Sequence, residues 1–169
     1  MKINLISRLL LVLVVACFAL TCEAQKEKTT TIILVRHAEK DPSGGNDPGL
    51  TPAGQARAAK LATLFPNATP DEMYTTAYTR TRATLAPWAG AAGVQVQSYN
   101  PANLPAFADQ LLKQTGKTIV VAGHSNTTPA LANLLLNTDR YKAWQDDEYN
   151  KLFVIEVTKG KAKGKVIEY

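Results

Sequence analysis

The sequence predicts an α/β protein, built as a three-layer α/β/α sandwich around a mostly parallel central sheet. Three apolar runs, at 31–35, 118–122 and 152–157, lack the alternation of apolar and polar residues that a half-solvated sheet would show. Such continuous runs are typical of strands that are buried on both faces. Segments with helical spacing separate the runs, and this alternation of strands and helices is the pattern of an α/β domain.

The first 24 residues are expected to lie outside this domain, because they have the three parts of a secretory signal peptide. Lys2 and Arg8 give a basic start, LLLVLVVACFAL is an apolar run of twelve, and residues 22–24 resemble a small-residue cleavage site. The run is too short for a membrane-spanning helix, which needs about 20 apolar residues. The sequence therefore predicts an exported protein, periplasmic or secreted, with no stable membrane span after cleavage. Two alternatives stay open: an uncleaved N-terminal anchor, and a lipoprotein anchor at Cys17 or Cys22.

Residues 25–169 then form a single domain of 145 residues, which is long enough to bury a core of its own. Both cysteines fall in the removed segment, so no disulfide is expected. Removal of Lys2, Arg8 and Glu23 takes the formal net charge from +5 to +4. Much of that charge lies on four lysines of a turn-like segment, 159–165, without interleaved aromatic residues. We therefore expect no nucleic-acid binding.

The first helix is expected to begin at Thr51 and Pro52 and to stop near Pro66. A threonine hydroxyl caps the free N–H groups of a first helical turn, and proline fits the first helical position. Four residues recur within the segment at helical spacing: Gly54, Ala58, Leu61 and Phe65.

Three further helices are expected at 79–92, 105–114 and 129–136. The first of them is rich in alanine, but Pro87 is expected to kink it or to make it start again. The other two each open with proline. The shorter strands are expected at 72–75 and 94–97, with a possible edge strand at 165–168.

The segment DPSGGNDPGL, residues 41–50, is predicted to be a loop between the first strand and the first helix. An ordinary cluster of turn residues would have the same composition. Its position favours a function, because ligands of open α/β sheets bind at the carboxyl ends of the strands. Both interpretations stay open at this point.

The sequence holds two histidines, and each directly follows an apolar strand: His37 ends TIILVRH, and His124 ends TIVVAGH. Neighbouring parallel strands would bring both rings to the edge of the sheet where such folds keep their sites. A metal would need three or more His, Cys or carboxylate ligands, and the adjacent Arg36 would repel it. We expect neither a metal nor another cofactor.

The pair Arg36 and His37 suits a phosphoryl group. Guanidinium offers paired donors that match phosphate, and a neutral imidazole can attack phosphorus covalently. Arg80 and Arg82, near the start of a helix, offer further donors. Side chains two apart on a helix point in different directions, so one of these arginines is expected to face the site and the other solvent.

These residues resemble the histidine phosphatase superfamily, which includes cofactor-dependent phosphoglycerate mutases and histidine acid phosphatases. Four blocks carry the resemblance in matching order and spacing: Arg36-His37-Ala38-Glu39, LTPAG at 50–54, Arg80 with Thr84, and Gly123-His124-Ser125. They span about 30 to 130 of the chain. Each block alone is weak, and the four together are specific.

The resemblance implies that His37 is the nucleophile and forms a phosphohistidine. It also implies that Arg36, Arg80 and His124 make the phosphate pocket, with Arg80 rather than Arg82 facing inward. In this interpretation His124 is positively charged or donates a hydrogen bond, and so stabilises the transferring group. A three-layer α/β/α fold is implied as well.

The chain departs from the family pattern at three points. The first block has Ala38 where glycine is common, a small change. Ser125 and Asn126 follow the second histidine where the acid-phosphatase branch has aspartate. The mutase-like branch draws its acid from the region after the second arginine, and between residues 82 and 118 the one carboxylate is Asp109, in a predicted helix.

The candidates for the proton donor are therefore Glu39 and Asp47, with Asp41 behind them, although each could equally be a solvated loop carboxylate. A phosphoanhydride, acyl phosphate or phosphohistidine would need no donor, because its leaving group has a low pKa. Asn46 is a candidate for a further hydrogen bond to the phosphate.

The sequence thus predicts an exported phosphohydrolase that acts through His37 on a small phosphorylated substrate, a phosphomonoester or a phosphoanhydride. Three alternatives stay open: a phosphate-binding module that has lost turnover, a mutase-type phosphotransferase, and a purely structural polar network. Short connections leave little chain for the lid that a mutase needs, which favours hydrolysis over transfer.

Overall fold

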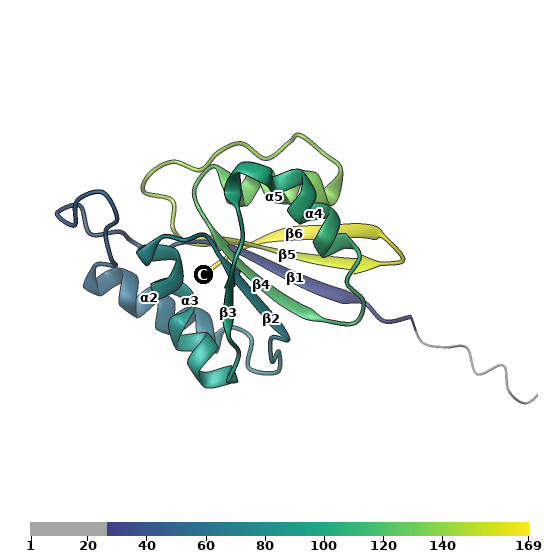
Figure 1. Ribbon diagram of the computed structural model, residues 1–169, viewed down its shortest axis with the longest axis horizontal. Helices are drawn as coiled ribbons and strands as arrows, with labels where there is room; N and C mark the ends of the chain where they lie inside the picture. The colour runs from purple at the N-terminus through teal and green to yellow at the C-terminus, as the bar shows by residue number, and fades with distance from the viewer. Residues whose placement is uncertain (1–26) are drawn as a thin grey trace, which may run out of the picture.

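The computed structural model describes residues 27–169, so the predicted signal peptide and both cysteines lie outside the described residues. Six strands form one sheet in the order β3-β2-β4-β1-β5-β6 (Figure 1). The strands are β1 (Thr30–Arg36), β2 (Glu72–Thr75), β3 (Val96–Ser98), β4 (Thr118–Gly123), β5 (Lys151–Thr158) and β6 (Lys161–Glu168). The helices are α2 (Pro52–Thr63), α3 (Thr79–Ala92), α4 (Leu104–Leu112) and α5 (Thr127–Leu136), with a short 3-10 helix η1 (Pro101–Asn103).

Helices cover both faces of the sheet, which confirms the predicted α/β fold with three layers. Figure 1 shows α2 and α3 on one side of the strands and α4 and α5 on the other. In β1, Ile32 and Leu34 pack toward α4 and α5, whereas Ile33 and Val35 pack toward α2 and α3. All four side chains are fully buried. Burial from two sides is the reason why this strand shows no polar alternation.

The sheet is mostly parallel, as predicted. β1 pairs parallel with β4, β4 with β2, and β2 with β3. β5 runs antiparallel to β1, and β6 antiparallel to β5. The carboxyl ends of the four parallel strands consequently open on one edge of the sheet, with β4 and β2 between β1 and β3.

The start of α2 is held against the residues that follow β1. The Thr51 hydroxyl accepts a hydrogen bond from Gly54 N at 3.1 Å, as expected of a helix cap. Thr51 N donates to the Glu39 carbonyl at 2.9 Å. A Cβ atom on Gly54 would lie 2.5 Å from that same carbonyl, so the close approach of helix and strand end requires glycine here.

The structure refines two element predictions. Of the two alternatives expected at Pro87, it excludes a new start: α3 continues through Pro87 as one helix, because buried Leu85 and Trp88 anchor it on both sides of the missing N–H. β3 begins at Val96 and not at residue 94, because Val94 N still bonds to Ala89 O in the turn that ends α3.

The edge strand β6 is longer than predicted. It begins at Lys161, four residues before the expected 165–168, and pairs with β5 along its whole length. Pairing with a long neighbour outweighs the weak strand propensity of its lysines and glycine. Among residues 27–169, no helix is long and apolar enough to cross a membrane.

Candidate active site

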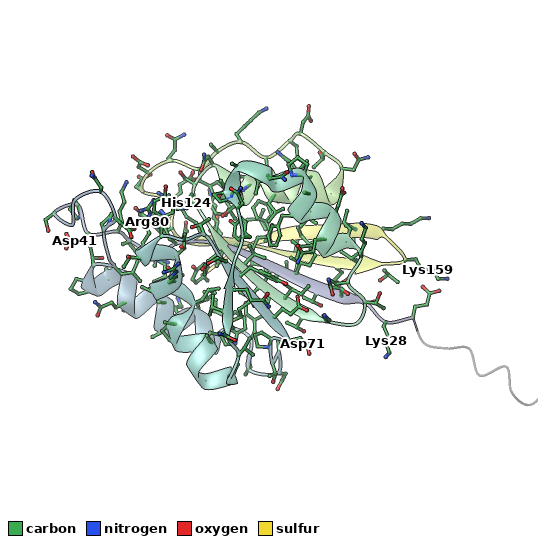
Figure 2. All side chains as sticks on the ribbon, in the orientation of Figure 1. Lys28, Asp41, Asp71, Arg80, His124 and Lys159 are labelled. Carbon is green, nitrogen blue, oxygen red and sulfur yellow. The ribbon has the colours of Figure 1, made fainter. Side chains whose placement is uncertain are left out.

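The two histidines converge at the carboxyl ends of β1 and β4. Arg36 and Gly123 are register partners in the parallel pair, and His37 N donates to the Gly123 carbonyl at 2.8 Å. The next residue along is His124, and the two ring centroids lie 5.4 Å apart with an interplanar angle of 68°. In Figure 2, His124 and Arg80 lie together at the end of the molecule opposite Lys28 and Lys159.

His37 is held as a neutral ring with its Nε2 free. Its Nδ1 lies 2.8 Å from the Ala38 carbonyl, which can only accept, so the proton is on Nδ1 and the lone pair is on Nε2. Burial, with a smaller contribution from the charges of Arg36 and Arg80, lowers the pKa of His37 to about 4, although the hydrogen bond to the Ala38 carbonyl acts in the opposite direction. This protonation state is the one that a nitrogen nucleophile needs.

His124 is also neutral here, which differs from the charged or donating ring implied by the resemblance. Arg80 Nη2 donates to His124 Nδ1 at 3.4 Å, so the proton is on Nε2, which donates to the Thr76 hydroxyl at 2.9 Å. Burial, together with the charges of Arg80 and Arg36, lowers the pKa of His124 to about 4. The two nearby guanidinium cations disfavour the protonated, positively charged form of His124.

Arg80 enters the site from the first turn of α3, and Arg82 does not. The Arg80 guanidinium lies over the Tyr78 ring, 4.5 Å from its centroid. Its Nε is buried, and no described residue accepts a hydrogen bond from it. Arg82, two residues on, is exposed on the outside of the helix, in agreement with the predicted division of roles.

Arg36 is 1% exposed, and its guanidinium binds the loop at 145–148, between α5 and β5. Its Nη1 donates to the carbonyls of Gln145 and Glu148 at 2.6 and 2.9 Å, and its Nη2 donates to the Asp146 carbonyl at 3.1 Å. The Tyr149 ring lies 4.1 Å from the guanidinium carbon. Burial lowers the pKa of Arg36, and nearby acidic groups oppose this shift. Its buried Nε–H has no hydrogen-bond partner among residues 27–169.

A cavity of about 530 Å³ opens above these groups, and Arg36, His37, Arg80 and His124 all line it. From the sequence, we proposed no phosphate-binding role for the other lining residues: Lys40, Tyr78, Pro101, Ala102, Ser125, Asn126, Thr127 and Asp146. Most of them follow a strand end or open a helix, and that position was the one available signal. No three His, Cys, Asp or Glu side chains in residues 27–169 are grouped to hold a metal.

The strand ends behind the cavity fit together closely. A Cβ atom on Gly123 would lie 2.8 to 2.9 Å from the hydroxyl oxygens of Thr128, Thr127 and Tyr99. The Thr127 hydroxyl accepts from His124 N at 2.9 Å. On the other strand, Ala38 N donates to the Thr84 hydroxyl at 2.9 Å, which explains the place of Thr84 among the four blocks.

The structure directs the two leading acid candidates to other partners. Glu39 forms an ion pair with Arg57, whose Nε lies 2.9 Å from Oε1, and it does not line the cavity. Partial burial raises the pKa of the Glu39 carboxyl, but the hydrogen bonds from Arg57 outweigh this and lower it. Asp47 accepts from Thr79 N and the Thr79 hydroxyl at the start of α3, and these bonds lower its pKa.

The remaining loop candidates also lie outside the cavity. Asp41 accepts from the Ser43 hydroxyl at 2.7 Å, which lowers its pKa. Asn46 is exposed in the loop and is not among the lining residues. Asp109 is exposed on α4. The loop 41–50 thus caps α3 through Asp47 and contributes no side chain to the lining of the cavity.

The sequence and the fold were both compared with known proteins. The family model of the histidine phosphatase superfamily (branch 1) matches residues 32–100. None of the curated proteins matches the chain.

Solved phosphatase structures share the fold at low sequence identity. A candidate phosphohistidine phosphatase SixA from Nakamurella multipartitia is 20% identical, with a TM-score of 0.64 over 83% of this chain and 96% of that one. The protein histidine phosphatase SixA complexed with tungstate is 11% identical, with a TM-score of 0.67 over 82% and 96%. A mycobacterial glucosyl-3-phosphoglycerate phosphatase is 11% identical, with a TM-score of 0.64 over 84% and 99%. The match over residues 32–100 and this shared fold confirm that the chain resembles the histidine phosphatase superfamily, as its sequence predicted.

Proposed function

We propose that this protein is a phosphatase in which His37 Nε2 takes a phosphoryl group from the substrate and passes it to water. The observation that carries the proposal is the meeting of a neutral imidazole, with its Nε2 free, and two arginines with buried, unpaired Nε–H groups. A phosphoryl group offers oxygen acceptors to the two Nε–H donors and a phosphorus atom to the nucleophilic Nε2. The phosphatase names of several similar structures support the same reaction class.

In this mechanism, each side chain has a separate task. His37 Nε2 attacks phosphorus while Arg36 and Arg80 donate to the equatorial oxygens. A bound dianion counteracts the two arginines at His124, so its pKa rises and the protonated, donating form becomes favoured. The donating role predicted for His124 therefore belongs to the complex with phosphate rather than to the free protein.

The environment of the carboxylates points to a particular kind of leaving group. Glu39, Asp47 and Asp41 all have lowered pKa values and hydrogen bonds elsewhere, so at neutral pH they hold no proton to give. We therefore propose substrates whose leaving group departs without protonation: an acyl phosphate, a phosphoanhydride or a phosphohistidine.

A comparison of leaving groups tests both parts of the proposal. We expect turnover of acetyl phosphate and 4-nitrophenyl phosphate, and much slower turnover of phenyl phosphate, because its leaving group is more basic. His37→Ala should abolish turnover of all three, and brief incubation of the wild type should leave an acid-labile, base-stable phosphoryl label. Equal rates for wild type and His37→Ala would end the proposal. Binding of phosphate without any product would favour the phosphate-binding module instead.

We also propose that the protein is exported, on the basic start and apolar run of its first 24 residues. Expression in a bacterial host and mass measurement of the envelope fraction test this. A chain that keeps residues 1–24 and stays with the cytoplasmic fraction would contradict it.

A further inference from the structure

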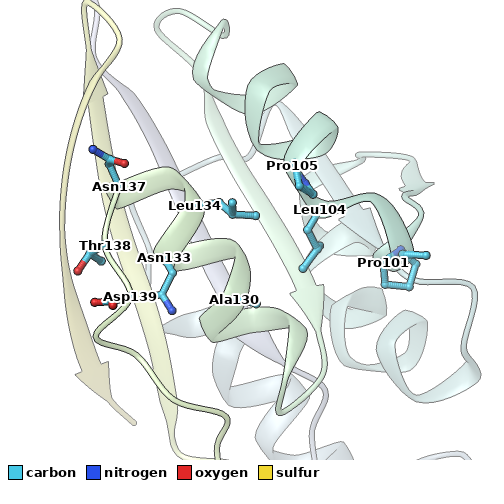
Figure 3. A pocket seen from close by; sticks show the side chains of 10 residues that line it. Pro101, Leu104, Pro105, Ala130, Asn133, Leu134, Asn137, Thr138 and Asp139 are labelled. Carbon is cyan, nitrogen blue, oxygen red and sulfur yellow. The ribbon is translucent and has the colours of Figure 1, made fainter.

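A second cavity, lined by residues of α4 and α5, adjoins the cavity around the two histidines, which we call the phosphate cavity. It has a volume of about 570 Å³, and it shares Pro101 and Ala102 of η1 with the phosphate cavity. We call it the α4–α5 groove. Its apolar walls are Leu104 and Pro105 from α4 and Ala130 and Leu134 from α5, and its polar lining residues are Asn133, Asn137, Thr138 and Asp139. Figure 3 shows Leu134 and Leu104 projecting from their two helices toward the same gap.

Leu134 is exposed on α5 and does not pack in the hydrophobic core. It is one of three large hydrophobic side chains exposed in residues 27–169, with 40% of its surface accessible. Its neighbours Leu131 and Leu135 fill the core, whereas Leu134 does not. The one charged side chain on the groove is Asp139. An apolar surface that adjoins an anion site suits a ligand with one charged end and one apolar end.

The strand order separates His37 from η1, whose residues line both cavities. His37 follows β1, η1 follows β3, and β4 and β2 lie between these strands. Adjacent strands are about 4.8 Å apart, so η1 lies several strand spacings from the end of β1. In-line displacement requires the leaving group to lie opposite the attacking nitrogen. A leaving group that extends from phosphorus toward η1 would therefore reach the groove.

We propose that the α4–α5 groove binds the leaving group of the substrate, that this leaving group carries an apolar part, and that Leu134 is a specificity-determining residue. The inference rests on the proposed phosphatase function. As the bond from His37 Nε2 to phosphorus forms, the bond from phosphorus to the leaving-group oxygen breaks, and its electron pair stays on that oxygen. Water then cleaves the phosphohistidine and releases phosphate and a proton.

Two acyl phosphates of matched chemistry test the inference. Acetyl phosphate and benzoyl phosphate both release a carboxylate, and they differ by the apolar ring that the groove would hold. We expect the wild type to prefer benzoyl phosphate in kcat/KM. Leu134→Gln, which keeps length and helix propensity, should lower kcat/KM for benzoyl phosphate by about five- to tenfold and leave acetyl phosphate unchanged. Val166→Thr is the matched control, because Val166 is also 40% exposed but lies on β6, away from the groove.

The possible outcomes separate the inference from the function on which it rests. Turnover of both compounds without a preference, or an equal loss of both in Leu134→Gln, would overturn the role of the groove and leave the phosphatase intact. A loss in Val166→Thr equal to that in Leu134→Gln would also overturn it. No turnover of either compound by the wild type would end the proposed function, and the inference with it.

Discussion

At the scale of single residues, the central feature is the neutral state of two neighbouring imidazoles. Both rings are removed from water beside two guanidinium groups, and the pKa of each is lowered to about 4. His37 is 4% exposed, so its shift reflects a real loss of solvation. The free protein is therefore prepared for an anion and for nucleophilic attack at neutral pH, at some expense of stability in acid.

The lowered pKa values predict that stability falls as the pH drops from 6.5 toward 4. In this window the unfolded chain binds protons at its histidines, whose ordinary pKa is 6.5, while the folded rings stay neutral, so proton uptake favours unfolding. The shift of His37 corresponds to about 3 kcal/mol over the window. Urea denaturation at pH 5 to 7 measures this slope.

His37→Gln provides the control for that slope. Glutamine does not titrate, so its pH dependence between 5 and 7 should be visibly shallower than that of the wild type. Carboxylates with lowered pKa values lose their contribution only at more acidic pH and do not interfere in this range. Parallel slopes for the two proteins would show that His37 is not held neutral by the fold.

The sequence sufficed to find the residues that strand ends bring together, and it failed for side chains whose partners come from elsewhere. Arg36, His37, Arg80 and His124 meet in one cavity because parallel strands share an edge. The pairing of Glu39 with Arg57, 18 residues away, depends on how α2 lies against β1. No local pattern reports such a contact, so the sequence alone did not show that Glu39 is paired in this way.

At the scale of elements, the central strands were easy to predict because they are buried on two faces, whereas the edge strands were harder to predict. β2 matches its predicted bounds, 72–75, and β4 extends its predicted range by one residue. β6 and β3 are the two edge strands, and both were displaced or misjudged in length, because an edge strand is set by its neighbour more than by its own sequence. The uninterrupted course of α3 is a third case in which packing decides.

That course of α3 predicts a stabilising substitution. Pro87 has no N–H for the carbonyl of Ala83 and is exposed in the helix interior. Pro87→Ala should raise the free energy of unfolding by about 1–3 kcal/mol. Urea denaturation measures it, with Pro105→Ala as the control, because Pro105 lies in the first turn of α4 where no N–H is missing. A less stable Pro87→Ala protein would mean that α3 needs the bend that proline provides.

At the scale of the whole molecule, the cavity joins segments that are distant in the chain. Its lining comes from the ends of β1 and β4, the start of α3, η1 and the loop that contains Asp146. An oxyanion bound there would link the parallel strands to both helical layers. Its binding energy should therefore appear in the global stability of the domain.

Tungstate, a tetrahedral oxyanion that one of the similar structures contains, is a suitable probe. We expect tungstate to raise the Tm of the wild type, with a stabilisation of about 2.7 kcal/mol at 100 times Kd. Arg80→Gln should lose most of this effect. Arg82→Gln, which removes the same charge from the outer side of the same helix, should keep it. Equal losses in the two variants would point to general charge attraction and away from a defined site.

The hold of Arg36 on the loop after α5 also bears on how the protein is made. The acceptors of its guanidinium lie 109 to 112 residues further along the chain. On the ribosome, this arginine lacks these acceptors until residues 145–148 have emerged, so the cavity cannot be completed before that point. A product terminated before residue 145 would enclose an unneutralised cation, and we expect proteases to remove it quickly.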